Sequence, residues 1–266
     1  MQCSITTPFQ AKAPTSARTW TAKLLIAAVL GCGVNLAHAE QQDADPAPTI
    51  ALNEYSAEYI VTRQGERHGA AQRSLTRVDN DLYQLSYRSE IEWMIFSDER
   101  QESSRFKYVD GAVLPIDYIL KRSGTGPDKT YKISFDHQQQ QVFSNQSKYP
   151  LECTWQQNFQ DVLSYQISLR QALSKGETKF TYPIVDKKGN NREYQFEVIG
   201  NETITLPIGN LETIKVKRVY DNDKRQAIAW FAPSLDHMMV RMYKGKDGVE
   251  QFQVELAKYT PGTATH

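Results

Sequence analysis

The stretch YQLSYRSEI, Tyr83 to Ile91, decides the fold class of this 266-residue chain. Its apolar side chains alternate with polar ones at a period of two, so that one face carries Tyr83, Leu85, Tyr87 and Ile91. Successive side chains of a β-strand point to opposite faces of the sheet, which makes this the pattern of a half-buried strand. One dry face and one wet face are typical of antiparallel sheet.

The same alternation recurs in REYQFEVIG at residues 192–200 and in QFQVELAKY at residues 251–259. Turn-forming pairs separate such segments, because Gly, Asn and Asp tolerate the positive φ angles of tight hairpins. These pairs are Asn80-Asp81, Asp110-Gly111, Gly189-Asn190, Gly200-Asn201, Gly209-Asn210 and Asp247-Gly248. The sequence therefore predicts one all-β domain at residues 53–260, an antiparallel meander of roughly 12 to 14 strands curled into a barrel or half-barrel. We expect residues 261–266 to form a tail.

One segment, QNFQDVLSYQISLRQAL at residues 157–173, has a helical period instead. We expect a single amphipathic helix over about 158–174, with Asp161 or Asn158 as its N-cap and Gly176 as its end. The apolar face comprises Phe159, Val162, Leu163, Leu169 and Leu173, with Tyr165 and Ala172 at its edge and Ser164, Ser168 and Gln171 opposite. Such a face must be buried, so the helix is predicted to cover the mouth or the open side of the barrel.

Two polar residues, Gln166 and Arg170, lie near the middle of this apolar face. An unpaired guanidinium is too costly to bury, so Arg170 either attaches the helix to the rim of the sheet or holds a ligand. Aromatic side chains can line a lipid cavity or stack on sugars. The candidate ligand-binding residues are therefore Arg170, Gln166, Tyr165 and Trp155.

Residues 1–39 have the composition of a secretory signal peptide. A polar start with basic and no acidic residues precedes an apolar run of eleven, residues 24–34, which is too short to span about 30 Å of hydrocarbon as a helix. The small-residue motif AHA follows and ends at Ala39. We expect cleavage after Ala39, a periplasmic protein, and a flexible lead-in at residues 40–52.

An alternative is a lipoprotein anchored through Cys32, because VLGC at residues 29–32 resembles a lipobox. In either case Cys153 remains as a lone thiol, and we expect it to be a small buried residue rather than a nucleophile.

Charge and motifs narrow the function classes. The chain after Ala39 contains 28 basic and 31 acidic residues, a net charge of −3, so a nucleic-acid partner is not expected. The run KVKR at residues 215–218 is expected to lie on a solvated face.

No motif such as G-x-S-x-G, H-E-x-x-H or C-x-x-C occurs, so we expect no catalytic residues, no metal site, no cofactor and no enzyme. The polar outward positions of the strands also argue against a membrane-spanning barrel, and we expect a monomer.

The chain resembles the exported bacterial proteins grouped as domain of unknown function 3108. The resemblance covers about residues 53–258 and rests on motifs in a shared order. They are Y-x-A-x-Y at Tyr55, Ala57 and Tyr59, then GERHGAAQRSL, SSRFKYVDGAVLPIDYIL, QDVLSYQISLRQAL, GNETITLPIGNLETIKVKR and AWFAP.

The resemblance implies a β-barrel or half-barrel similar to that of the lipoprotein carriers of the periplasm, and it carries over no catalytic residue. Those carriers cover their sheet with several helices, whereas this sequence predicts one. We therefore expect a binding or carrier module for a lipid-like or other amphiphilic ligand. The alternative is a structural or assembly factor of the cell envelope that binds another envelope protein or a glycan. An enzyme is the third and weakest interpretation.

Overall fold

The computed structural model describes residues 52–146 and 153–262. The predicted signal peptide, its cleavage site after Ala39, the alternative anchor at Cys32 and most of the predicted lead-in lie outside the described residues. No helix among the described residues is long and apolar enough to cross a membrane.

Thirteen antiparallel strands form one sheet. They are β1 (Tyr55–Arg63), β2 (Glu66–Arg77), β3 (Leu82–Trp93), β4 (Phe96–Val109), β5 (Ala112–Gly124), β6 (Lys129–Asp136), β7 (Gln141–Ser144), β8 (Lys179–Val185), β9 (Asn191–Leu206), β10 (Gly209–Val219), β11 (Arg225–Ala232), β12 (Met238–Lys246) and β13 (Val249–Pro261). The strand number and the all-β class agree with the prediction.

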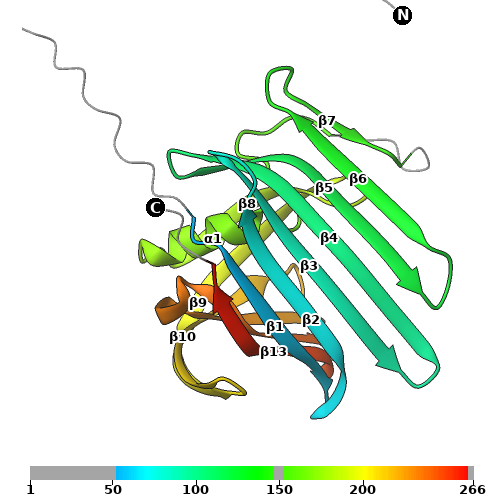
Figure 1. Ribbon diagram of the computed structural model, residues 1–266, viewed down its shortest axis with the longest axis vertical. Helices are drawn as coiled ribbons and strands as arrows, with labels where there is room; N and C mark the ends of the chain where they lie inside the picture. The colour runs from blue at the N-terminus through cyan, green and yellow to red at the C-terminus, as the bar shows by residue number, and fades with distance from the viewer. Residues whose placement is uncertain (1–51, 147–152, 263–266) are drawn as a thin grey trace, which may run out of the picture. The chain divides into compact units, whose positions relative to one another are not determined.

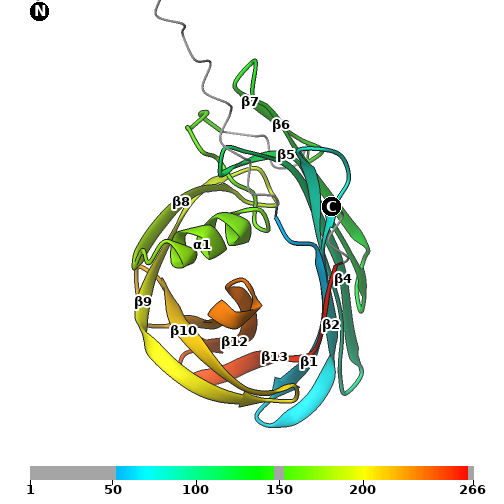
Figure 2. The ribbon, with the colours of Figure 1, turned by 60° about the vertical axis from the view of Figure 1, so that its left-hand side comes forward.

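Strands that follow one another in sequence pair with one another, except β7 and β8, and β1 also pairs with β13. The predicted meander is therefore confirmed. The sheet curls into a ring (Figure 2), but no hydrogen-bonded ladder joins its two edge strands, β7 and β8. The long hairpins from β1 to β6 form one broad wall of this ring (Figure 1).

The chain crosses the gap in the ring just before the helix α1 (Tyr165–Ser174). The Gln160 backbone pairs with β8, because Gln160 N donates to the Pro183 carbonyl and Val185 N donates to the Gln160 carbonyl, each at 2.9 Å. Its side-chain Nε2 donates to the Val113 carbonyl of β5, also at 2.9 Å. Since this backbone is committed to β8, the helix begins seven residues later than the predicted start near 158. A short 3₁₀ helix, η1 (Pro233–Leu235), connects β11 and β12.

The C-terminal end of α1 follows the predicted capping chemistry, whereas the N-cap is Ser164 rather than Asp161 or Asn158, and no side chain caps it. Asp161 Oδ1 accepts hydrogen bonds from the backbone N–H groups of Leu163 and Ser164, at 2.7 and 2.8 Å, and so caps the turn that leads into α1. At the other end Gly176 has φ +78° and donates to the Leu173 carbonyl, while Glu177 N donates to the Ala172 carbonyl. This is a Schellman motif, which ends a helix at a glycine.

The helix α1 lies inside the ring beside β8, as Figure 2 shows, rather than on top of it. Ile167 packs into the larger apolar cluster, which includes residues of β1–β6 and of later strands, and Leu169 and Leu173 pack into a second cluster with β8–β12. Because α1 packs on both sides, Ser174 at its end is the one residue of this helix that is exposed. Ser164, predicted to lie opposite the apolar face, is fully buried, and Ser168 is half-buried.

At two of the predicted turns, Gly200-Asn201 and Gly209-Asn210, the structure differs from the prediction. Gly200-Asn201 is not a hairpin, because β9 continues through it and Gly200, with φ +144°, sits at a β-bulge where the register with β10 shifts. A bulge and a turn both need positive φ, so the glycine alone does not distinguish them. The β9–β10 turn itself is formed by Pro207 and Ile208, and Gly209 opens the next strand.

Candidate functional site: the barrel lumen

The ring encloses a cavity of about 540 Å³, referred to below as the lumen. Its wall combines apolar, aromatic and charged side chains that come from α1 and from most of the strands. The apolar part of the wall comprises Leu120, Val162, Leu163, Leu169, Phe196, Val216, Ile228, Phe231, Met239, Met242, Phe252 and Val254. The barrel is therefore hollow, which is the arrangement that a bound amphiphile requires.

The charges of the lumen are strongly unbalanced. Seven basic side chains line it: Arg73, Arg100, Lys187, Lys188, Arg192, Arg218 and Lys244. Only two carboxylates, Glu102 and Asp186, line it as well. This excess is local, because the whole chain has a formal net charge of zero. A lumen of this kind attracts anions.

Arg73 on β2 is the most buried of these cations, with only 8% of its surface exposed. It has no ion-pair or hydrogen-bond partner among the described residues, and its Nε is buried without an acceptor. Its guanidinium carbon lies 5.9 Å from the ring centre of Tyr87 on the neighbouring strand. A buried guanidinium without an anion is costly, which marks Arg73 as a place where a ligand's negative charge would be stabilised.

Arg218 and Lys244 are likewise without a carboxylate partner in the described ranges. Each lies next to an aromatic ring instead. Arg218 Cζ lies 3.4 Å from the ring centre of Tyr194, and Lys244 Nζ lies 5.3 Å from that of Phe252. The Lys244 side chain retains accessible surface although protein surrounds it, because that surface faces the lumen. Burial, together with the charges of Arg100 and Arg218, lowers the pKa of Lys244.

Three tyrosines of the lumen, Tyr59, Tyr118 and Tyr165, are neutral at ordinary pH. Burial raises the pKa of Tyr165 to about 12, and burial also raises the pKa of Tyr59. Burial and the neighbouring Glu102 raise the pKa of Tyr118, whose hydroxyl donates to Glu102 Oε2 at 2.6 Å. These three tyrosines therefore add no charge to that of the basic side chains and the two carboxylates of the lumen.

The sequence matches a family model described as Protein of unknown function (DUF3108) over residues 54–253. The chain belongs to this family. No curated protein matches the sequence. The resemblance drawn from the motifs is thus confirmed, and the family indicates no enzymatic activity.

Solved structures show where the DUF3108 fold has relatives. A β-barrel-like protein of the DUF1849 domain family from Brucella abortus is 9% identical, with a TM-score of 0.56 over 79% of this chain and 98% of that one. A protein with a YmcC-like fold from Bacteroides fragilis, provisionally described as exported, is 12% identical, with a TM-score of 0.31 over 77% of this chain and 95% of that one. At 9% identity the likeness to the Brucella abortus protein concerns the fold alone.

The four residues predicted to bind a ligand do not all meet in this DUF3108 barrel. Tyr165 and Gln166 line the lumen, whereas Arg170 and Trp155 do not. Trp155 lies ahead of α1 and packs edge-on against His137, with the ring centres 5.2 Å apart. The assignment of the four residues as ligand-binding remains a prediction.

Arg170 connects α1 to the turn that follows η1. Its Nε donates to the Asp236 carbonyl at 3.0 Å, and its Nη2 lies 2.8 Å from Asp236 Oδ2. Its side chain is 10% exposed, its Cζ lies 5.2 Å from the ring centre of Tyr55, and its Nη1 is buried without a partner. The geometry is that of an arginine fixing the helix to the rim of the sheet.

Sequence reasoning missed the basic residues of the lumen, although a signal was present. Arg73 lies two residues from the apolar Ala71 and Leu75 and so shares their strand face. The alternation of the strand therefore predicts that its side chain points inward. Arg218, assigned with the run at 215–218 to a solvated face, follows Val216 at the same parity and lines the lumen. The same rule would have identified Lys244, two residues after Met242 on β12.

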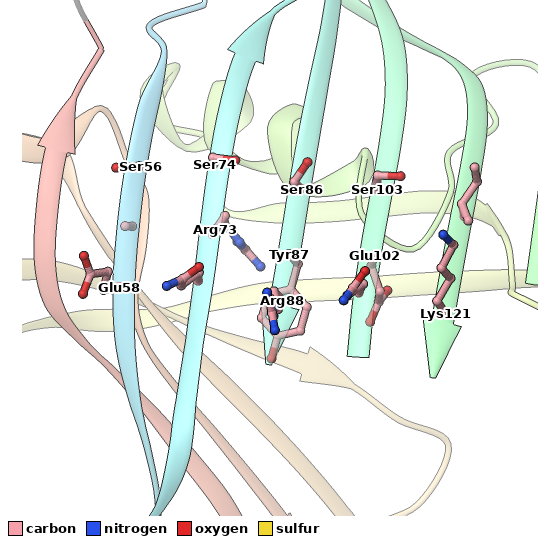
Figure 3. Close-up of a pocket in the computed structure, with 14 residues that line it drawn as sticks. Ser56, Glu58, Arg73, Ser74, Ser86, Tyr87, Arg88, Glu102, Ser103 and Lys121 are labelled. Carbon is pink, nitrogen blue, oxygen red and sulfur yellow. The ribbon is translucent and has the colours of Figure 1, made fainter. Parts of the chain in front are cut away.

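A second hollow, of about 640 Å³, lies on the outer face of β1–β5 (Figure 3). Four serines stand in register across four strands, namely Ser56, Ser74, Ser86 and Ser103. The next row carries the longer side chains of Glu58, Gln72, Arg88, Gln101 and Lys121, so the hollow forms where short side chains adjoin long ones. None of these outward side chains holds a buried polar atom without a partner. The lumen is therefore the stronger candidate site.

No group of three or more His, Cys, Asp or Glu side chains in the described ranges is placed to hold a metal ion. Cys153 is half-buried, and its Sγ lies 2.7 Å from Asn191 Oδ1. Burial raises the pKa of this thiol, so it is a weak nucleophile at neutral pH.

Proposed function

We propose that this DUF3108 protein is a non-enzymatic binding or carrier module whose lumen takes an amphiphile with an anionic head group, such as a fatty-acid carboxylate or a lipid phosphate. The observation that carries the proposal is Arg73, a buried guanidinium without an anion that faces a hollow interior. Arg218 and Lys244 add two further cations that have aromatic rather than carboxylate neighbours.

Both halves of an anionic amphiphile find complementary groups in the lumen. The apolar wall suits an acyl chain, because burying hydrocarbon is favourable by about 0.8 kcal/mol per CH₂. A carboxylate or phosphate next to Arg73 would accept charge-assisted hydrogen bonds and offset the cost of burying that guanidinium. The volume of about 540 Å³ falls within the range of ordinary small-molecule sites, roughly 300 to 1,000 Å³.

Binding assays with a matched pair of ligands test the proposal. We expect palmitate to compete with a fluorescent fatty-acid probe for the purified protein, and hexadecanol, which has the same chain and no charge, to bind at least about tenfold more weakly. Arg73→Met should weaken palmitate binding by on the order of tenfold or more, because it removes the buried cation and keeps the apolar bulk. The matched control is Arg88→Met on β3, whose side chain is exposed and paired with Glu90.

Native mass spectrometry of the purified protein should also show a co-purifying species of lipid mass. The proposal is wrong if neither palmitate nor a lysophospholipid binds. Equal binding of palmitate and hexadecanol would refute the assignment of an anionic head group. An unchanged palmitate affinity in Arg73→Met would refute the assignment of Arg73.

A structural or assembly factor of the cell envelope is the second candidate, and the outer hollow on β1–β5 is the observation that favours it. The unpaired edge strand β7 offers a further place where a partner strand could add. This candidate predicts that replacing Ser74 and Ser86 by Lys abolishes a protein or glycan interaction while palmitate binding is unchanged.

A periplasmic location is part of the proposal. Intact-mass measurement of the exported protein should give a chain that begins at Glu40. A mature chain that begins at an acylated Cys32 would instead indicate a membrane-anchored lipoprotein.

A further inference from the structure

The hairpin turn between β3 and β4 exposes four consecutive large apolar residues. Met94 and Ile95 are 87% and 86% exposed, and Trp93 and Phe96 on either side are about half exposed. Met94 also adopts a positive φ of 55°. Tight hairpin turns favour Asn, Asp or Gly at such a position, so folding alone gives no reason for this sequence. Residues that violate a local rule without a structural gain are often there for function.

The exposed apolar residues of the whole described chain concentrate at the same end of the barrel. Nine large apolar side chains are exposed, and six of them lie in or next to the turns β3–β4, β10–β11 and β12–β13. These six are Trp93, Met94, Ile95, Phe96, Val219 and Val249. Because neighbouring strands are antiparallel, these three turns share the end of the barrel that also carries the β1–β2 turn (Figure 1).

A hollow of about 920 Å³, referred to below as the mouth, opens at this end. The mouth continues into the lumen, because the two share lining residues that include Tyr194, Arg218 and Lys244. Trp93 lines the mouth, and Arg63 Cζ lies 4.1 Å from the centre of the Trp93 ring. The apolar turn therefore borders the entrance of the cavity.

Cations surround this entrance. Six basic and three acidic side chains line the mouth. Five of the basic side chains have no ion-pair partner among the described residues, and they are Arg63, Arg218, Arg225, Lys244 and Lys246. Apolar side chains that project from a basic rim are the combination by which proteins bind anionic membrane surfaces, the apolar groups entering the interface and the cations meeting lipid phosphates. Trp is the residue most suited to that depth, because its ring is apolar and its N–H is polar.

We propose that the β3–β4 turn docks the mouth of the barrel onto an anionic phospholipid surface. Met94 and Ile95 enter the lipid interface, Trp93 and Phe96 lie at its boundary, and the basic rim contacts the phosphates. The docking orients the lumen entrance toward the lipid. It does not require a loaded lumen, so its failure and the failure of the proposed function give different results.

Vesicle co-sedimentation tests the docking with the purified protein. Vesicles of equal parts phosphatidylcholine and phosphatidylglycerol should sediment the wild-type protein at low salt, and vesicles of phosphatidylcholine alone should sediment much less. The double variant Met94→Ser, Ile95→Ser should partition on the order of a hundredfold less, about tenfold for each apolar side chain withdrawn. Palmitate binding in solution should be unchanged in this variant, because neither residue lines the lumen.

Val78→Ser is the matched control, since Val78 is 54% exposed in the β2–β3 turn at the opposite end of the barrel. It should sediment like the wild type. The fluorescence of Trp93 should shift to the blue with the mixed vesicles, and Trp93→Phe should remove that shift.

Three results would overturn the docking. One is a wild-type protein that does not sediment with the mixed vesicles. Another is equal sedimentation of the wild type and the double variant. The third is a wild-type oligomer that the double variant converts to a monomer without any effect on vesicles, which would make the turn a contact between copies of this chain.

Discussion

The two ends of this barrel differ in how their charged and apolar side chains are accommodated. At the end where α1 packs, charged groups have partners: Asp161 accepts hydrogen bonds from two backbone N–H groups and from Ser104 Oγ, and Arg170 pairs with Asp236. At the mouth, Arg63 and Arg218 contact aromatic rings and have no ion-pair partner among the described residues, and large apolar side chains project into solvent. The first arrangement stabilises the fold, whereas the second costs stability unless something else binds there.

The contrast separates residues that hold the barrel together from residues kept for another purpose. Substitutions at the helix end should lower the free energy of unfolding. Substitutions of the unpaired basic residues at the lumen and the mouth should leave the free energy of unfolding unchanged or raise it while binding is lost. This trade between stability and function is common where sites contain uncompensated charge.

The largest expected effect is that of Leu169→Ala. Leu169 is 2% exposed, joins α1 to the β8–β12 cluster and borders the lumen, so its truncation removes packing between the helix and the sheet and enlarges the space between them. We expect the free energy of unfolding to fall by about 2 to 5 kcal/mol. Urea denaturation monitored by circular dichroism measures it. A loss well below 1 kcal/mol would mean that α1 contributes little to closing the barrel.

The next effect depends on pH and concerns Asp161. Burial raises the pKa of this carboxyl to about 6, above its ordinary value of about 3.9. The folded protein therefore holds the proton more tightly than the unfolded chain, so the contribution is full below about pH 4 and is lost as the pH rises through about 6. The free energy of unfolding should fall by on the order of 2 to 3 kcal/mol between these limits through this one group.

Asp161→Asn provides the comparison for that measurement. The amide does not titrate, and its oxygen can still accept from Leu163 and Ser164. The difference in unfolding free energy between wild type and Asp161→Asn, measured at about pH 4 and about pH 7, isolates the group. A difference that stays constant with pH would contradict the raised pKa.

A smaller decrease in the free energy of unfolding is expected for Arg170→Met. The substitution leaves Asp236 without its partner, but the Asp236 side chain is 48% exposed and remains solvated. We expect a loss of about 1 kcal/mol. In a double-mutant cycle with Asp236→Asn, the coupling free energy between the two residues should account for most of this loss. A coupling energy near zero would show that Arg170 acts through its packing against Tyr55 instead.

A substitution of the unpaired cation in the lumen should not lower the free energy of unfolding. Arg73→Met removes a buried cation that has no partner, and we expect the free energy of unfolding to stay the same or rise by up to about 1 kcal/mol. Thermal melts of the ligand-free protein measure it. A clear loss of stability would show that Arg73 supports the fold. The main reason for proposing the lumen as a binding site would then be wrong.

Much of the barrel follows from local patterns. Strand alternation such as that of Tyr83, Leu85 and Tyr87 is set by the period of the backbone, so it specified the strands and the face that each one buries. Capping is equally local, which is why Gly176 marked the end of α1 correctly, whereas Asp161 caps the preceding turn and the N-cap of α1 is Ser164. The bulge at Gly200 was misread because a positive φ serves a bulge as well as a turn.

What only the tertiary structure decided is how distant residues meet. The start of α1 depends on Gln160 pairing with β8, a contact between segments that no local pattern encodes. Arg73, Arg218 and Lys244 come from three separate hairpins, and each alone is an ordinary charged residue in an alternating strand. Curling the sheet turns one face of every strand toward a common axis, and this curvature gathers charges scattered along a neutral chain into one basic lumen. Local sequence determines which face of a strand a side chain occupies, whereas the curvature of the sheet determines what that face surrounds.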